Sequence, residues 1–252
     1  MKHTNPHSIY SDLADAAMAR FSGETVLDCA IGQHCVAIES QAGTGLAFNT
    51  EDAWQLTADA GGAKAVEMCF RGVSLDALIP QYPHGDPLAA VISLAAINSV
   101  LNDNSSHQKG DFVWSDILAS RRLAMVGCFT PLLSVVYKSV QELIIFELED
   151  LPDMHRPEEA PRLMPTCDAV IITAATFSNQ TFHDYLPHIS PGASVYIIGP
   201  TTPLADFLCN RFHLGGSLVV DTPLVLKKIR DDATYKSIQP WLQKVICPRK
   251  IP

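Results

Sequence analysis

Residues 123–131 read Leu-Ala-Met-Val-Gly-Cys-Phe-Thr-Pro, a short apolar run that passes directly into a glycine and then a Thr-Pro pair. An apolar run of this length that ends at a turn residue is typical of a strand buried on both faces of a sheet. Proline is favoured in the first turn of a helix, so a helix can begin at the Thr-Pro pair. The stretch therefore predicts a strand, a tight turn and a helix, the repeating unit of a parallel α/β sheet.

The same unit recurs along the second half of the chain. Further strands are predicted at residues 143–147, 169–173, 195–198 and 218–220, and each stretch between them is long enough to hold a helix. The crossovers between such strands are right-handed by default. We therefore predict that residues 111–252 form a Rossmann-like domain with a parallel sheet of five strands.

The first part of the chain has a different pattern, with a helix over residues 7–21 followed by three strand-like runs at residues 25–31, 35–39 and 45–48. A second helix is predicted over residues 86–101, where Asp86 is suited to cap the helix and the next residue is proline. This helix is apolar almost all round, which indicates burial. We predict a small α+β domain over residues 1–110, so that the fold class of the whole chain is α/β with two domains.

Composition and charge exclude several classes of protein. Apolar residues make up 47% of the chain and charged residues 18%, which is typical of a globular protein. The net charge of -9 and the absence of a lysine and arginine cluster argue against a nucleic-acid partner. No apolar stretch is long enough to span a membrane, and the N-terminus does not resemble a signal peptide. Seven cysteines without C-x-x-C spacing favour reduced thiols, and we expect a cytoplasmic protein.

The candidate site follows from the predicted sheet, because parallel sheets bind ligands beyond the carboxyl ends of their strands. The residues that follow each predicted strand are mostly small or polar. The residues that we place at this ligand-binding edge are Gly127, Cys128, Glu147, Thr173, Thr176, Asn179, Thr181, Gly199, Pro200, Thr201, Thr202 and Asp221.

Each group in this set has a reading as a ligand contact and a plainer structural reading. Gly127 permits close approach of the backbone to a ligand, and it equally suits an ordinary tight turn. Glu147 could bind a ribose hydroxyl or a metal ion, and the plainer interpretation of residues 147–150 is a solvated acidic loop. The polar side chains of residues 173–181 offer more hydrogen bonds than helix capping needs, while residues 199–203 could either hold an anion or simply begin a capped helix. Asp221 adds a carboxylate at the end of the fifth strand.

Several familiar sites are absent from the sequence. There is no G-x-G-x-x-G fingerprint, no Walker A loop and no G-x-S-x-G elbow. Cys128 has no neighbouring histidine or lysine in the sequence to activate it, so an inert thiol is the favoured interpretation. Cys29, His34 and Cys35 form the only compact Cys/His group, but no second cluster supplies a fourth ligand, which favours a structural role.

The chain resembles the DUF4213/DUF364 family, whose members are described as heavy-metal chelation proteins. The motifs that carry the resemblance lie at residues 94–98, 126–131, 172–181 and 199–203. The resemblance implies a first domain like the N-terminal domain of enolase, packed on a Rossmann-like second domain. Two positions depart from the family pattern: Ala174 stands where a glycine is usual, and Cys128 stands where a bulkier residue is expected.

Our leading hypothesis is a protein that binds a metal ion or a metal-chelating small molecule at the strand ends, facing the first domain; a transition metal ion is the cofactor that we consider. The alternative is an enzyme that acts on a nucleotide- or pterin-like molecule at the same cleft. A structural or assembly role is a third hypothesis. The sequence assigns no catalytic residue, and a homodimer is one assembly that we keep open.

Overall fold

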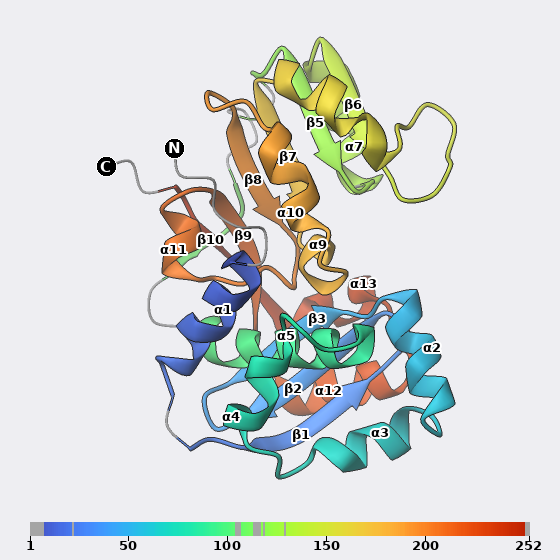
Figure 1. Cartoon of the computed structure of the whole chain (residues 1–252), viewed down its shortest axis with the longest axis vertical. Coiled ribbons are helices and arrows are strands. Elements are labelled where there is room, and N and C mark those ends of the chain that lie inside the picture. Colours follow the sequence, from blue (N-terminus) through green and yellow to red (C-terminus); the bar gives the residue numbers. More distant parts are fainter. Residues whose placement is uncertain are drawn as a thin grey trace.

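The computed structural model describes the chain from residue 8 to residue 249, except for residues 22, 104–106, 113–116, 118 and 129. Two sheets organise these residues, one with three strands and one with seven (Figure 1). The smaller sheet is built by the first part of the chain, and the larger sheet by the second part. A mixed α/β architecture was predicted from the sequence, and the structure confirms it.

The smaller sheet is an antiparallel meander of β1 (Val26–Ile31), β2 (Cys35–Ser40) and β3 (Thr44–Phe48). Helix α5 (Pro87–Leu101) lies across one face of this sheet. It begins as predicted, because the Asp86 carboxylate accepts a hydrogen bond from the Ala89 amide and a proline occupies the first turn. The contact is close at Gly45, where a Cβ atom would lie 2.1 Å from the Ala95 carbonyl oxygen.

Shorter helices surround this unit (Figure 1). They are α1 (Ser8–Met18), α2 (Glu51–Asp59), α3 (Ala63–Phe70) and α4 (Leu75–Leu78), with a turn of 3-10 helix at Ile79–Gln81. None of the helices in the described part of the chain is both long enough and apolar enough to cross a membrane.

The larger sheet has the order β4-β10-β9-β8-β7-β5-β6. The five predicted strands are present and parallel to one another. Two further strands, β10 and β4, extend the sheet in antiparallel orientation and were not predicted. The bounds of the strands are β4 (Gln108–Lys109), β5 (Arg122–Val126), β6 (Glu142–Phe146), β7 (Ala169–Thr173), β8 (Ser194–Ile198), β9 (His213–Val219) and β10 (Leu242–Cys247).

Side chains alternate between the two faces of this sheet. One face joins the core shared with α5 and contains Ala124 and Ile172, whereas the other contains Met125 and Ile171. The helices between the strands are α7 (Thr130–Ser139), α8 (Ala160–Leu163), α9 (Ala175–Ser178), α10 (Phe182–Tyr185) and α11 (Asp206–Cys209), with turns of 3-10 helix at Pro157–Glu159, Met164–Thr166 and Leu186–His188.

The order of the parallel strands contains a reversal that matters for the site. After β5 the chain moves to β6 on one side, and after β6 it crosses over to β7 on the other side of β5. The loops that follow β5 and β7 therefore diverge and leave a crevice between them. Doubly wound sheets bind their ligands at this kind of switch point.

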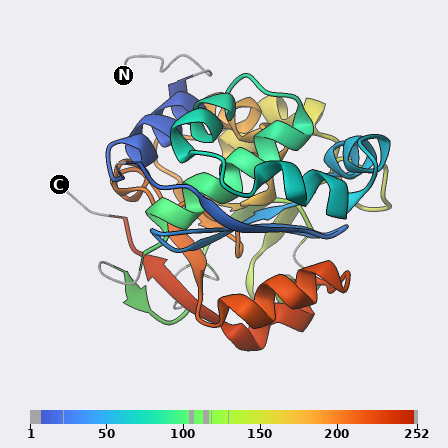
Figure 2. The same cartoon turned by 90° about the horizontal axis from the view of Figure 1, so that it is seen from below.

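The C-terminal part of the chain returns to the smaller sheet. Helices α12 (Thr222–Arg230) and α13 (Tyr235–Ile238), followed by a 3-10 turn at Gln239–Trp241, cover the face of that sheet opposite to α5 (Figure 2). Val225 and Ile229 of α12 pack there against Ala30 and Ala37. Helices α12 and α13, which we assigned to the second domain, therefore pack on the sheet of the first, and the domain boundary near residue 110 stays a prediction.

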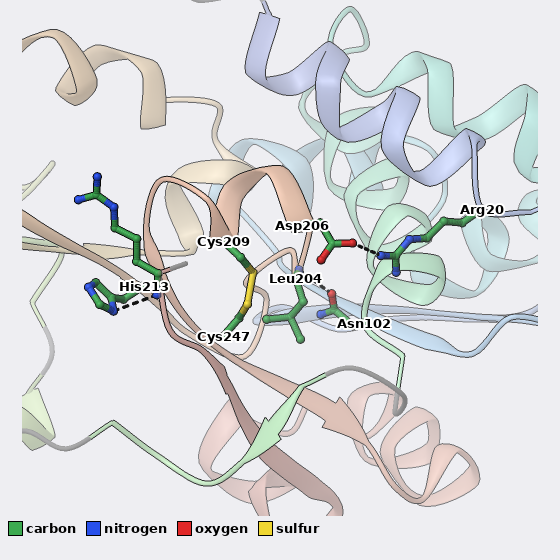
Figure 3. The surroundings of a disulfide bond; sticks show 8 residues. Arg20, Asn102, Leu204, Asp206, Cys209, His213 and Cys247 are labelled. Atoms are coloured by element: carbon green, nitrogen blue, oxygen red, sulfur yellow. Dashed lines mark hydrogen bonds and ion pairs between the residues drawn. A yellow bond between two sulfur atoms is a disulfide. The ribbon is translucent and has the colours of Figure 1, made fainter. Parts of the chain in front are cut away.

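A disulfide joins Cys209, at the end of α11, to Cys247, at the end of β10 (Figure 3). Their Cα atoms are 6.0 Å apart, and 38 residues separate them in the sequence. The prediction that all seven thiols are reduced is therefore wrong for this pair. Cysteine spacing could not reveal the bond, because β10 reaches Cys209 only through its antiparallel pairing with β9.

Candidate ligand-binding cleft

A cleft of about 630 Å³ lies at the carboxyl ends of β5, β6 and β7, at the switch point of the larger sheet. Its volume is in the range of small-molecule sites. Both parts of the chain contribute to its walls. The lining residues are Phe48, Thr50, Glu51, Asp52, Val126, Gly127, Cys128, Phe146, Glu147, Leu148, Glu149, Thr173, Ala175, Thr176, Asn179, Thr181 and Tyr185.

Gly127 makes the turn at the end of β5. Its φ of +82° lies in the left-handed region that favours glycine. A Cβ atom there would lie 2.7 Å from Cγ2 of Thr173, the last residue of β7, so the ends of β5 and β7 can lie this close only because Gly127 has no side chain. The main-chain amide of Gly127 donates a hydrogen bond to the Phe146 carbonyl, 2.9 Å away.

Glu147 joins the loops that follow β5 and β6. One carboxylate oxygen accepts a hydrogen bond from the Cys128 amide and the other from the Leu148 amide, both at 2.9 Å. The side chain is therefore held in one position, and its negative charge is partly balanced by main-chain dipoles. The Glu147 carboxylate therefore connects two loops of the cleft and also places a negative charge in it.

The loop after β7 is held by its own polar side chains. Thr176 donates a hydrogen bond to the Thr173 carbonyl, and the Asn179 oxygen Oδ1 accepts hydrogen bonds from the amide and the hydroxyl of Thr181. Gln180, between them, has a left-handed φ of 56°. With Oδ1 engaged, the Nδ2 group of Asn179 makes no hydrogen bond to another described residue, so it is available as a donor.

Tyr185 is a lining residue that the sequence interpretation missed. Only 2% of the residue is exposed, and its hydroxyl makes no hydrogen bond to another described residue. Burial raises the pKa of Tyr185 to about 12, and the nearby negative charges of Asp184 and Glu147 add to the effect. The hydroxyl therefore stays protonated near neutral pH and can donate a hydrogen bond into the cleft.

The opposite wall comes from the end of β3 and the start of α2. Phe48 ends the strand, Thr50 caps the helix by accepting a hydrogen bond from Ala53, and the exposed side chains of Glu51 and Asp52 follow. The sequence interpretation also missed this wall. The only signal was an Asn-Thr-Glu-Asp stretch after a strand, and nothing in the sequence placed it opposite β5.

The structure brings seven of the twelve predicted residues into the cleft and leaves five outside it. In the loop after β8, which contains Gly199, Pro200, Thr201 and Thr202, the Thr202 hydroxyl shares its proton between the Gly199 carbonyl of the same loop and the Gly215 carbonyl of β9, each 2.8 Å away. Asp221 caps α12, where it accepts a hydrogen bond from the Leu224 amide. The Thr201 and Thr202 carbonyls accept hydrogen bonds from Asn98 and Asn102 of α5, so the loop after β8 packs against the first part of the chain and does not border the cleft.

Comparison with known proteins identifies the family. Residues 14–101 match the family model DUF4213 and residues 111–247 match DUF364, and both families carry the description "Putative heavy-metal chelation". The chain belongs to the DUF4213/DUF364 family. No curated protein matches the sequence.

Two solved structures share the whole fold of this DUF364 protein. A DUF364 protein of unknown function from Desulfitobacterium hafniense DCB-2 has 22% sequence identity and a TM-score of 0.80, with coverage of 98% of this chain and 99% of that chain. A second one, from Pyrococcus horikoshii, has 20% identity and a TM-score of 0.78, with coverage of 94% and 98%. At these identities the likeness establishes the fold alone.

The family description can be compared with the donor atoms that this DUF364 protein offers. Within the described residues, no group of three or more His, Cys, Asp or Glu side chains lies close enough to hold a metal ion. Cys29 and Cys35 are buried in the smaller sheet, and burial raises the pKa of both thiols, that of Cys35 to about 12. A buried protonated thiol is a poor metal ligand. The described side chains therefore form no preformed set of three or more protein ligands for a metal ion.

Proposed function

We propose that the chain binds a metal-bearing ligand, either an ion or a small-molecule chelate, in the cleft at the switch point. One observation carries the proposal: four carboxylates, those of Glu51, Asp52, Glu147 and Glu149, line the cleft. Among the described residues that line it, none is a lysine, arginine or histidine. A cleft lined by charge of one sign attracts ligands of the opposite sign.

The four carboxylates also bear on the alternative function, an enzyme that acts on a nucleotide- or pterin-like molecule. The switch point is where doubly wound sheets bind nucleotides, and this position favours the alternative. However, the phosphate groups of a nucleotide would meet four carboxylates and no basic lining side chain. The charges therefore favour a cationic occupant over a phosphorylated one.

Binding can be tested with the full chain by calorimetry and native mass spectrometry. The probes are Zn²⁺ and Ni²⁺ salts and their small-molecule chelates, and ATP serves as the nucleotide probe. We expect a metal-bearing probe to bind, and we expect the double variant Glu51→Gln, Asp52→Asn to weaken its binding about tenfold through the loss of two charges. Asp150→Asn removes one exposed charge beside the cleft without changing its lining, and it should bind like the parent protein.

Three outcomes would contradict the proposal. The first is the absence of any mass increase or heat with every metal-bearing probe. The second is equal binding of these probes to the parent protein and to the double variant. The third is tighter binding of ATP than of any metal-bearing probe, which would instead support the nucleotide alternative.

A further inference from the structure

The carboxylates of the cleft do not form a metal-ligand set by themselves. Both oxygens of Glu147 accept main-chain hydrogen bonds, and Glu51, Asp52 and Glu149 are exposed side chains on two different segments of the chain. Within the described residues, no three ligating side chains converge there or elsewhere. The charges can attract a cation, but these side chains cannot replace the hydration shell of a transition metal ion.

The cleft has an apolar component that a bare ion would not use. Phe48 and Leu148 line it from the two parts of the chain, and they are 43% and 50% exposed. The buried residues Val126 and Phe146 also contribute to its lining. Apolar and aromatic side chains that line a concave site offer contact area to an organic ligand, and a bare ion would not use it.

Two hydrogen-bond donors complete the cleft. The Tyr185 hydroxyl belongs to a residue that is 98% buried, since only 2% of it is exposed, and it has no partner among the described residues. The Asn179 Nδ2 group is also without such a partner, because its amide is oriented by Thr181. Both donor groups belong to residues that line the cleft, so an occupant that presents an acceptor atom can bind them.

We infer that the occupant of the cleft is a flat organic molecule that carries a positive charge and a hydrogen-bond acceptor. Any metal it brings is held by the atoms of that molecule and not by protein side chains. This inference rests on the proposed function and narrows it from any metal-bearing ligand to an organic chelate. The apolar ring packs between Phe48 and Leu148, the acceptor faces Tyr185 and Asn179, and the positive charge faces Glu51 and Asp52.

The complex of Zn²⁺ with one equivalent of 8-hydroxyquinoline is a suitable probe. It is flat and positively charged, it carries an oxygen acceptor, and its fluorescence reports transfer into an apolar environment. Fluorescence titration of the full chain would compare this complex with Zn²⁺ alone and with 8-hydroxyquinoline alone, with calorimetry for the ion. We expect the complex to bind at least about tenfold more tightly than either component, since only the complex satisfies the apolar and charged walls together.

Three variants assign the contacts. Phe48→Ala should weaken binding of the complex about tenfold through lost apolar contact, and Tyr185→Phe should weaken it about fivefold through the loss of one hydrogen bond. Tyr137→Ala removes an aromatic side chain that is 58% exposed and lies outside the cleft, so it should leave binding unchanged. The melting temperature of each variant is measured first, so that a loss of binding is not confused with a loss of fold.

The outcomes separate this inference from the proposed function. If Zn²⁺ alone binds as tightly as the complex and depends on Glu51 and Asp52, the proposed function stands and the organic occupant is overturned. If the complex binds but Phe48→Ala and Tyr185→Phe have no effect, the inference is again overturned. If neither the ion nor the complex binds, both statements fail.

Discussion

The side-chain amide of Asn98 donates one hydrogen bond to the Thr201 carbonyl, 3.0 Å away, and another to the Leu46 carbonyl, 2.7 Å away. One fully buried side chain of α5 thereby holds both the edge strand of the smaller sheet and the loop after β8. Asn102, one turn later, donates a hydrogen bond to the Thr202 carbonyl and accepts one from the Leu204 amide. Figure 3 shows the contact between Asn102 and Leu204. These contacts join α5 and the smaller sheet to the loop that follows β8 of the larger sheet.

Replacing Asn98 by alanine should destabilise the protein by about 2–4 kcal/mol, because two buried carbonyls lose their donor at once. Urea unfolding followed by circular dichroism would measure the change. Asn210→Ala is a matched control, because Asn210 is exposed and its substitution should stay within about 0.5 kcal/mol. Equal unfolding midpoints for the two variants would show that α5 does not hold the sheets together in this way.

Gly127→Ala should destabilise the protein by about 1–3 kcal/mol, because the new methyl group combines a left-handed backbone with a contact of 2.7 Å to Thr173. Gly192→Ala is the control: a Cβ atom at that position would meet nothing within 4 Å. Chemical denaturation of both variants measures the difference. A Gly127→Ala variant as stable as Gly192→Ala would mean that the loops after β5 and β7 can move apart.

Asp28 should stabilise the fold in a pH-dependent way. Burial alone would raise its pKa from 3.8, but the hydrogen bonds from Arg230 and the Cys29 amide, with the charges of Arg230 and Arg71, outweigh burial and lower it. The pKa of Asp28 is lower in the folded protein than in the unfolded chain. The stabilisation is therefore complete above the unfolded-state pKa and is lost as the pH falls through the folded-state pKa. The loss of stability caused by Asp28→Asn should therefore be larger at about pH 7 than at about pH 3.

This prediction can be checked by urea unfolding of the parent protein and of Asp28→Asn at both pH values. Arg230 also binds Glu67, so Arg230→Ala will be destabilising by itself. In that background, however, the effect of Asp28→Asn at neutral pH should shrink, because its main partner is gone. An effect of the same size at both pH values would exclude an ionised Asp28 as the source of stability.

The disulfide should contribute about 2–4 kcal/mol, since it closes a loop of 38 residues in the unfolded chain. The double variant Cys209→Ser, Cys247→Ser should lower the melting temperature, while Cys69→Ser, at an exposed free thiol, should not. Thiol titration of the unfolded, unreduced protein should count the five free cysteines at positions 29, 35, 69, 128 and 167. A count of seven would show that the bond does not form.

Local sequence was sufficient for the elements with strong and continuous signals. The apolar runs of β5 and β7 and the capped start of α5 at Asp86 were predicted correctly, because each depends on neighbouring residues alone. Strand β10 was missed: only Val245, Ile246 and Cys247 form its apolar run, and an antiparallel strand near an edge needs no continuous apolar sequence. The cytoplasmic location that we expected stays a prediction. It rested mainly on reduced thiols, and the disulfide between Cys209 and Cys247 contradicts that premise.

The sequence by itself determined that Gly127, Glu147 and residues 173–181 lie at one edge of a sheet, since the carboxyl ends of parallel strands share an edge. The sequence could not determine which of these strand ends border a cleft and which are covered by other parts of the chain. The tertiary structure decided this, because strand order places the crevice between β5 and β7, while Asn98 and Asn102 of α5 close the loop after β8. It also brought Glu51 and Asp52 to the opposite wall, because the packing of distant segments depends on the whole core and not on local sequence.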